Sequence, residues 1–167
     1  MDLNLTMIII IILFGFIAAF IDSVVGGGGL ISTPALLAIG LPPSVALGTN
    51  KLASSFGSLT STIKFIRSGK VDLYVVAKLF GFDFLSAAGN AKVLNFASNI
   101  GALVLFMVLG QVDYVIGLIL ATSMIAGSYT GAHFAIKQGV GYVKVLFIII
   151  TAILILKNAF DYIQQFV

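Results

Sequence analysis

Residues 22–30 read DSVVGGGGL, and this stretch separates two apolar segments of very different length. Before it, Leu5 to Ile21 is apolar and uncharged. After it, Leu30 to Ile39 has only ten residues and is closed by the sequence GLPP at 40–43. Ten residues rise about 15 Å as a helix, roughly half of a bilayer. The pattern therefore predicts a membrane span followed by a glycine-preceded half-helix, which is either a re-entrant or a broken-helix element.

The composition of the whole chain agrees with a membrane location. Of 167 residues, 60% are hydrophobic and 9% are charged, and the mean hydropathy is +1.17. One small core cannot bury so much apolar surface, which excludes a soluble globular domain. The net charge of +3 comes from nine basic and six acidic residues and reflects few acids rather than a basic patch, so a nucleic-acid partner is not expected.

Five segments are long and apolar enough to be predicted as transmembrane helices. They lie in a single multi-pass domain, residues 1–167, of the all-α integral membrane class. No basic residue precedes the first segment, so we interpret it as a retained span rather than a signal peptide. Val71 to Phe84 is too short and too charged for a further span. The five predicted spans are Leu5–Ile21, Ser44–Ile66, Leu85–Leu109, Tyr114–Ile136 and Tyr142–Phe160.

Basic residues predict the orientation. One cluster follows the second span and two lysines flank the loop before the last span: Lys64, Arg67, Lys70, Lys78, Lys137 and Lys144. Cytoplasmic loops carry such an excess of Lys and Arg. With five spans and a re-entrant half-helix, the N-terminus is expected in the cytoplasm and the C-terminus outside, in the cell (inner) membrane.

An internal repeat relates residues 7–73 to residues 81–114. A shift of 41 positions superposes similar residues, including a stripe of polar side chains: Gly48 on Gly89, Lys51 on Lys92, Ser54 on Asn95, Ser58 on Asn99, and Phe65 on Phe106. Under the predicted topology the two copies cross the membrane in opposite directions. The sequence therefore predicts an inverted repeat, an arrangement found in many transporters.

Two sequence blocks point to a known family. Residues 22–36 contain DSVVGGGGL and TPAL, and residues 46–52 read ALGTNKL. Together they resemble the N-terminal signature of the sulfite exporter TauE/SafE family, and NAKVLNFASN at 90–99 resembles the signature of that family's second half. The resemblance implies a multi-pass carrier of small anions, with sulfite or organosulfonates as candidate substrates.

The chain departs from that family in its centre. Family members are longer, and their second half has its own glycine-rich segment before the Asn-Lys signature. Here residues 75–79 run almost directly into Gly81-Phe82-Asp83, so the central helices are expected to be missing. We therefore expect a shortened anion carrier, with a non-transporting membrane subunit or a remnant of such a carrier as the alternative.

The repeated polar stripe supplies most of the candidate substrate-binding residues. Lysines within a span are costly in lipid and usually face protein or water, where they attract an anion. Serine and asparagine at the following turns offer hydrogen bonds. The alternative is structural, with each lysine reaching the nearer interface and the Ser and Asn side chains joining helices. The set comprises Lys51, Ser54, Ser58, Lys92, Asn95 and Asn99, together with Asn50 and Asn90 of the two signatures.

The glycine stretch is the second candidate site. Successive backbone N–H groups of Gly26, Gly27, Gly28 and Gly29, with a helix start behind them, suit an anion. The same glycines also suit a plain bend that lets helices pack closely. Asp22 is a coupling or structural residue: it can pair with Lys51 or Lys92, take part in proton coupling, or cap the bend.

Other functions find little support. With one His, no Cys and no Glu, we predict no enzyme, no metal site and no cofactor. Ser123, Gly127 and Gly131 recur every four residues and predict a close helix contact. Because the second copy lacks a half-helix to cover Lys92, we hypothesise a homodimer in which a second chain supplies that cover. The expected partners are the lipid bilayer and a small anionic solute.

Overall fold

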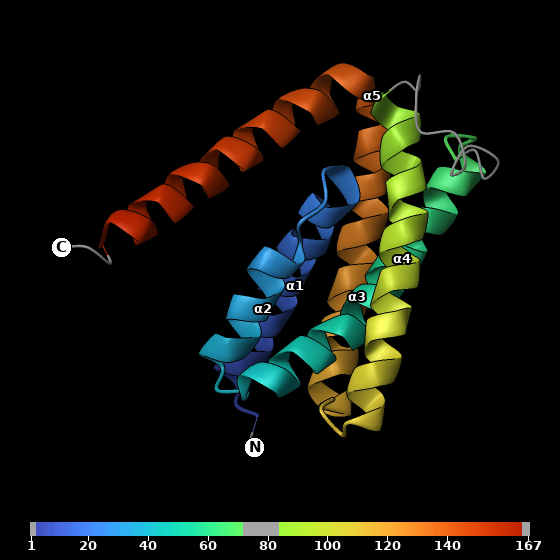
Figure 1. Cartoon of the computed structure of the whole chain (residues 1–167). Helices are drawn as coiled ribbons and strands as arrows, with labels where there is room; N and C mark the ends of the chain where they lie inside the picture. The colour runs from blue at the N-terminus through green and yellow to red at the C-terminus, as the bar shows by residue number, and fades with distance from the viewer. Residues whose placement is uncertain (1–2, 72–83, 165–167) are drawn as a thin grey trace.

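The computed structural model describes residues 3–71 and 84–164, with side chains for 3–71, 89–139 and four further positions, Tyr142, Val145, Ile148 and Ile149. Its described residues form five helices and no strand, which confirms the all-α prediction (Figure 1). The helices are α1 (Leu5–Val24), α2 (Gly29–Ala38), α3 (Pro43–Arg67), α4 (Phe84–Val108) and α5 (Tyr114–Gln164).

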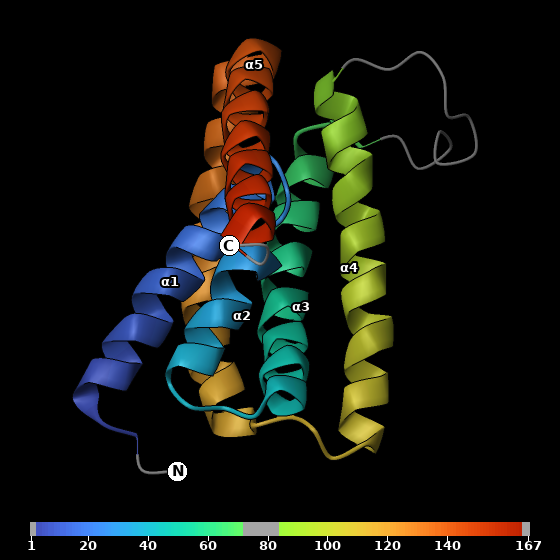
Figure 2. The ribbon, with the colours of Figure 1, turned by 60° about the vertical axis from the view of Figure 1, so that its left-hand side comes forward.

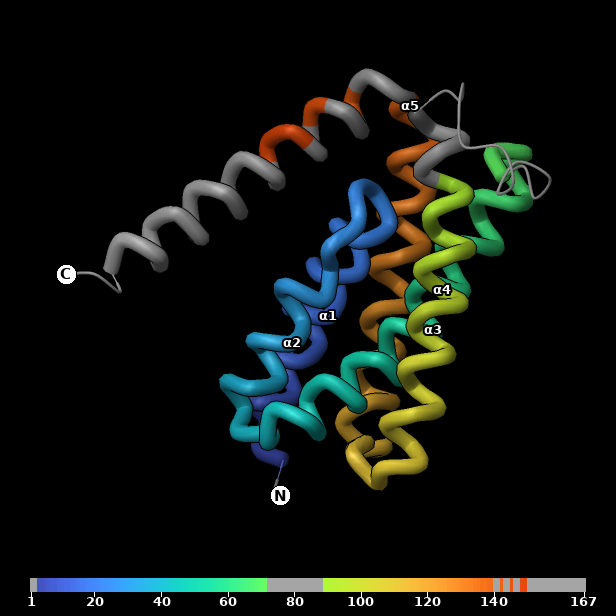
Figure 3. The backbone as a smooth tube through the Cα atoms, in the orientation of Figure 1, coloured from blue at the N-terminus to red at the C-terminus, as the bar shows by residue number. Residues whose placement is uncertain are grey.

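The glycine stretch turns the chain back along α1. Asn4 caps the start of α1 by accepting a hydrogen bond from the Met7 N–H at 2.8 Å. At the other end, Gly26 and Gly27 have positive φ values of 91° and 86°, which residues with a Cβ rarely adopt. Gly28 then packs against the backbone of Ala18, below the end of α1, before the half-helix α2 begins. Figure 3 shows this path of the backbone.

The half-helix returns the chain to the end of the bundle where α1 starts. Leu36, Ile39 and Leu41 form a buried cluster with Ile11, and Leu3 packs against the same cluster. The glycine turn and α2 together therefore cover most of the height of α1 in the opposite direction. The expectation that Leu30–Ile39 re-enters and returns to the side it came from is wrong, because the chain leaves α2 beside the start of α1 rather than beside its end.

Helices α1 and α3 and the first part of α5 run in one direction, and α4 runs against them (Figures 1 and 2). Val24 of α1, Phe65 of α3 and Ala132 of α5 form a second buried cluster, so the late parts of these helices meet at one end of the bundle. Gly89, early in α4, lies against Phe65 and the Lys70 carbonyl at the same end. The start of α1 and the basic end of α3 are therefore at opposite ends, and the expectation that they share one side of the membrane is wrong.

The predicted small-residue face is confirmed in the contact between α1 and α5. A methyl group at Gly127 would overlap the carbonyl oxygen of Phe16, and one at Gly131 would overlap that of Phe20. Ser123 lies against Gly15 in the same way. Small residues at a spacing of four let two helix backbones approach closely, as is common in membranes.

The pair α3 and α4 shows a reciprocal set of contacts. Gly48 lies against Phe106 and the Gln111 carbonyl, and Gly89 lies against Phe65 and the Lys70 carbonyl. Each contact becomes the other when 41 is added to the residue numbers of the first copy and subtracted from those of the second. Ser58 and Asn99, also 41 apart, bond to each other. The helix ends match too, since Gly69 and Gly110 have φ values of 69° and 66°. Segments related in this way and running in opposite directions are the geometry of an inverted repeat.

Fewer helices meet the criteria of a membrane span than the sequence predicts. Within the described residues, three are long and apolar enough: Leu5–Val24, Gly89–Val108 and Tyr114–Gly139. Helix α3 has 25 residues, about 37 Å, but its buried face is rich in Ser, Thr and Asn, which lowers its hydropathy. The predicted span Tyr142–Phe160 is the second part of α5, which changes direction at Gly139 (φ 75°, ψ −170°). The segment 72–83 lies outside the described residues.

Candidate functional site

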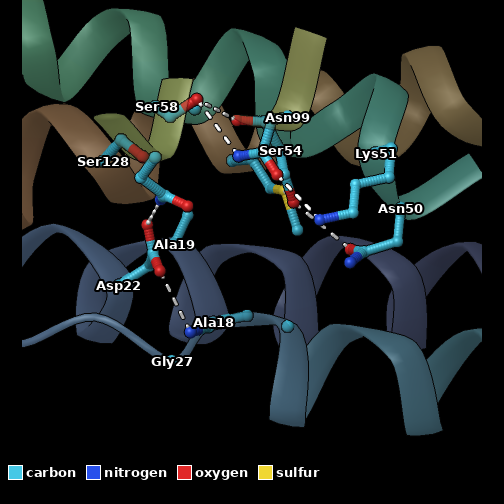
Figure 4. A pocket seen from close by; sticks show the side chains of 15 residues that line it. Ala18, Ala19, Asp22, Gly27, Asn50, Lys51, Ser54, Ser58, Asn99 and Ser128 are labelled. Atoms are coloured by element: carbon cyan, nitrogen blue, oxygen red, sulfur yellow. Dashed lines mark hydrogen bonds between the residues drawn. The ribbon is translucent and has the colours of Figure 1, made fainter. Parts of the chain in front are cut away.

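A polar cavity of about 150 Å³ lies among α1, the glycine turn, α3, α4 and α5 (Figure 4). We call it the polar cavity. Its lining residues are Ala18, Ala19, Asp22, Gly27, Gly28, Gly29, Asn50, Lys51, Ser54, Gly57, Ser58, Asn95, Asn99, Met124 and Ser128. The cavity therefore has room for a small oxyanion.

Asp22 receives hydrogen bonds from two separate segments. The backbone N–H of Gly28 donates to Oδ1 at 3.1 Å, and the Nδ2 group of Asn95 donates to Oδ2 at 3.2 Å. The ammonium of Lys92 donates to the main-chain carbonyl of the same residue. Asp22 thus joins the glycine turn to α4. Its carboxylate accepts hydrogen bonds from the Gly28 N–H and the Asn95 amide, and an anion in the cavity would bind to the same two donors.

Lys51 anchors the opposite wall of the cavity. Its Nζ donates to Oδ1 of Asn99 at 3.0 Å, and Nδ2 of Asn99 donates to Oγ of Ser58 at 3.4 Å (Figure 4). The partner of the ammonium in this bond is a neutral amide. A half-buried cation held by a neutral group keeps its charge available for an anion.

Asn50 connects the half-helix to α3. The hydroxyl groups of Ser32 and Ser54 both donate to its Oδ1, at 2.7 Å and 3.4 Å. Ser32 is fully buried and also donates to the carbonyl of Gly28. These bonds fix the position of α2, and with it the glycines that line the cavity.

The structure brings most of the candidate residues together. The lining includes Asp22 and nine of the proposed substrate-binding residues: Gly27, Gly28, Gly29, Asn50, Lys51, Ser54, Ser58, Asn95 and Asn99. Gly26, Asn90 and Lys92 are not in the lining. Lys92 is only 4% exposed, and its contact with the Asp22 backbone gives it a positioning role behind the wall.

Some lining residues had not been singled out from the sequence. Ala18, Ala19 and Gly57 are small, so they leave room for the cavity rather than contributing polar groups. Ser128 and Met124 come from α5 and face α3; Ser54 donates to the sulfur of Met124 at 3.8 Å. The only sequence signal for Ser128 is its place one residue after Gly127, beside the close contact of α1 with α5.

The chemistry of the cavity fits an anion better than a metal. Its described polar groups include one ammonium, three amides and three hydroxyls, and Asp22 is its single acid. No cluster of three or more His, Cys, Asp or Glu side chains occurs in the described part of the chain. Ammonium, amide and hydroxyl groups are donors, and an oxyanion offers several acceptor atoms to them.

The polar side chains Lys92, Asn95 and Asn99 of α4 are covered by other residues of the same chain. Lys92 and Asn99 are 4% exposed each, and Asn95 is bonded to Asp22 of the same chain. The expectation that a monomer leaves these side chains uncovered, which is the reason for the homodimer hypothesis, is therefore wrong. The last turn of α1 in the same chain reaches α4 through Asp22, which bonds to both Lys92 and Asn95.

The chain matches one protein family along most of its length. The family described as "Sulfite exporter TauE/SafE" matches residues 11–82 and 74–158. The two matched segments meet at 74–82, where the sequence predicts that central helices are missing. No solved structure matches the chain.

Alignments of the chain with several curated proteins span most of the length of each protein. A "Probable membrane transporter protein" of Haemophilus influenzae is 24% identical over 249 positions, which cover 96% of this chain and 98% of that protein. "Probable membrane transporter protein ORF9" of a Sinorhizobium species is 25% identical, with 96% of this chain and 95% of that protein covered. "Probable membrane transporter protein YfcA" of Escherichia coli K12 is 25% identical, with 87% of each covered. Because the alignment with the Haemophilus protein is longer than the 167 residues of this chain, that protein has an internal stretch that the chain lacks.

Proposed function

The chain belongs to the sulfite exporter TauE/SafE family, a family of membrane transporters, and on that basis we propose that it carries small oxyanions, with the polar cavity as their binding site. The observation that carries the proposal is the cavity lining itself. Lys51 supplies a positive charge, and Ser54, Ser58, Asn95 and Asn99 supply hydrogen-bond groups from two helices. Sulfite, with four non-hydrogen atoms and up to two charges, is the substrate that we favour; organosulfonates are larger.

Asp22 would act as a competitor for the substrate. Its carboxylate accepts hydrogen bonds from Gly28 and Asn95, and an incoming oxyanion needs donors of the same kind. Substrate entry would therefore shift Asp22 away from one or both of these groups. In this scheme Asp22 couples substrate binding to the position of the glycine turn, and Lys92 holds its main chain in place.

The distribution of basic residues supports an orientation. The basic side chains Lys64, Arg67 and Lys137 lie at the end of the bundle where α3 ends. We assign this end to the cytoplasmic side of the cell membrane, because cytoplasmic ends are rich in Lys and Arg. Since α1 and α3 run in the same direction, the start of α1 then lies outside, which reverses the original expectation for the N-terminus. Val167 lies outside the described residues.

The alternative is a non-transporting membrane subunit or a remnant. The observation that favours this alternative is that the chain lacks an internal stretch that the Haemophilus relative has. A remnant that keeps the polar cavity would bind an anion without moving it. Binding and flux therefore have to be measured separately.

The test uses purified protein in detergent and in proteoliposomes. We expect radiolabelled sulfite to bind the detergent-solubilised chain and to enter proteoliposomes down its gradient, with chloride a poor competitor. Lys51→Gln should reduce both signals, and Lys137→Gln, which changes an exposed lysine away from the cavity, should reduce neither. Binding without flux would support the remnant. A folded protein that does not bind sulfite or a sulfonate would contradict the proposed site.

A further inference from the structure

A second hollow lies at the end of the bundle where α3 ends, and it shares no lining residue with the polar cavity. Its volume is about 400 Å³. We call it the basic groove, and its lining residues are Thr60, Ile63, Lys64, Arg67, Ser68, Tyr129, His133 and Ile136. Nothing in the proposed transport scheme uses it.

The groove follows the seam between two helices. Its α3 residues Thr60, Lys64 and Arg67 are spaced by four and three positions, so they share one face of that helix. Its α5 residues Tyr129, His133 and Ile136 have the same spacing. Behind these faces the two helices close on the buried cluster of Phe65 with Ala132 and Ala135. The groove is therefore an outward-facing channel along a closed helix contact.

The groove carries positive charge that no acid in its described lining neutralises. The ammonium of Lys64 lies 3.2 Å from the centre of the Tyr129 ring, a cation–π contact. Arg67 and His133 are exposed beside it. A lysine ammonium over a ring face keeps its positive charge. Arginine binds phosphate groups through two parallel N–H donors.

Below the groove, both helices continue its faces with exposed apolar side chains. On α3, Phe56 lies one turn before Thr60 and is 40% exposed. On α5, Ile125 lies one turn before Tyr129 and is also 40% exposed, and Leu118 follows two turns further at 54%. The seam is thus basic at its end and apolar toward the middle of the bundle.

We propose that the basic groove binds an anionic phospholipid, with the phosphate group at Lys64 and Arg67 and an acyl chain along the seam of Phe56 and Ile125. A polar anion-binding end joined to an apolar strip matches an amphiphile and not a soluble anion. The position agrees as well, because the last turns of a membrane-spanning bundle lie at the depth of the headgroups. Basic pockets between helices at the cytoplasmic surface are suited to anionic headgroups.

The test measures binding of short-chain lipids to the purified full chain in neutral detergent, by native mass spectrometry and by calorimetric titration. The probes are dihexanoyl phosphatidylglycerol, dihexanoyl phosphatidylcholine and inorganic phosphate. We expect the anionic lipid to bind much more tightly than the zwitterionic one. Each basic side chain near an anionic surface is worth about fivefold in affinity, so the double variant Lys64→Gln/Arg67→Gln should lose about 25-fold.

Two variants control for charge and for place. The exchange Lys64→Arg/Arg67→Lys keeps both charges and should keep most of the affinity. Lys137→Gln removes a basic side chain at the same end but outside the groove, and it should bind like the wild type. Circular dichroism and size-exclusion elution establish that each variant is folded. If the double variant does not fold, the two single variants and the salt dependence of the wild type give the same comparison.

Three outcomes would overturn the proposal. The first is equal affinity for the two lipids. The second is wild-type affinity in a folded double variant. The third is displacement of the anionic lipid by inorganic phosphate at the same concentration, which would show that the headgroup alone binds and that the seam contributes nothing.

Discussion

At the scale of single residues, the two repeated lysines have different surroundings. Lys51 lines the polar cavity and bonds to Asn99, whereas Lys92 is buried behind the wall and bonds to the Asp22 backbone. We predict that Lys51→Gln weakens sulfite binding by at least tenfold, because a charge-assisted hydrogen bond contributes about 1.5–3 kcal/mol. Isothermal titration in detergent measures this, and unchanged affinity would remove Lys51 from the site.

For Lys92 we predict a loss of stability. Lys92→Met removes the buried donor to the Asp22 carbonyl, and an unsatisfied buried group costs about 1–3 kcal/mol. The unfolding temperature should fall by several degrees and flux should fall with it, while the affinity of the protein that remains folded changes less than in Lys51→Gln. A tenfold loss of affinity with unchanged unfolding temperature would instead place Lys92 in contact with the substrate.

For Asp22 we predict a change in sulfite affinity that is opposite to that of Lys51→Gln. Asp22→Asn removes the negative charge that occupies the Gly28 N–H and the Asn95 amide. We predict that sulfite binds about tenfold more tightly, a change of ~1.4 kcal/mol, because the competing anion is gone. Flux should fall, since tighter binding slows release. Weaker binding in a folded Asp22→Asn variant would contradict the role of Asp22 as a competitor.

The sequence could predict the chemistry of these residues but only part of their arrangement. The 41-residue repeat made Lys51 and Lys92 equivalent, and as a pattern it contains no difference between them. The difference arises because the first copy is flanked by α1 and the glycine turn, whose Asp22 reaches α4 and holds Lys92. The sequence allows a pairing of Asp22 with Lys51 or Lys92, but a periodic pattern does not show that Lys92 bonds to the main-chain carbonyl of Asp22 while the carboxylate bonds to Asn95.

At the scale of elements, the helix boundaries are close to those predicted. Leu30–Ile39 is observed as Gly29–Ala38, and Leu85–Leu109 as Phe84–Val108. Glycine and proline mark these ends through backbone geometry, which is a local property. The direction in which α2 runs is not a local property, because it depends on the packing of Gly28 beside Ala18. The prediction from the sequence of the side at which α2 ends is therefore wrong.

The contact of α1 with α5 can be tested with paired glycine substitutions. Gly127→Ala would place a methyl group against the Phe16 carbonyl, a main-chain atom that cannot rotate away. We predict a loss of about 1–3 kcal/mol in stability. Gly101→Ala in α4 is the matched control, because nothing lies within 4 Å of the added carbon. That change should stabilise the helix by about 0.5–1 kcal/mol.

Thermal unfolding in detergent, followed by circular dichroism, compares the two substitutions directly. A lower unfolding temperature for Gly127→Ala beside an equal or higher one for Gly101→Ala would support the close contact of α1 with α5. Equal effects of the two alanines would contradict it.

At the scale of the whole molecule, the helix directions predict which segments share a side of the membrane. Thr6 at the start of α1 and Leu109 after α4 lie at one end, and Gln138 before the kink lies at the other. The native chain has no cysteine, so single cysteines at these positions report location without background. We predict that a membrane-impermeant maleimide labels Thr6→Cys and Leu109→Cys in intact cells, and labels Gln138→Cys only after lysis.

The labelling pattern separates two kinds of error. If all three labels were inverted, the assignment of the basic end to the cytoplasm would be wrong while the bundle itself stayed correct. If Thr6→Cys and Gln138→Cys behaved alike, the parallel directions of α1 and α5 would be wrong.

The ammonium of Lys64 over the ring of Tyr129 also has an optical consequence. The chain contains five tyrosines and no tryptophan, so its near-ultraviolet fluorescence comes mainly from phenol rings and is not masked by indole emission. A cation in contact with one ring alters the emission of that ring, and Tyr129→Phe identifies its share of the signal. Any ligand that draws Lys64 away from Tyr129 would then change the fluorescence of the unlabelled protein, which makes this residue pair a built-in reporter of the basic groove.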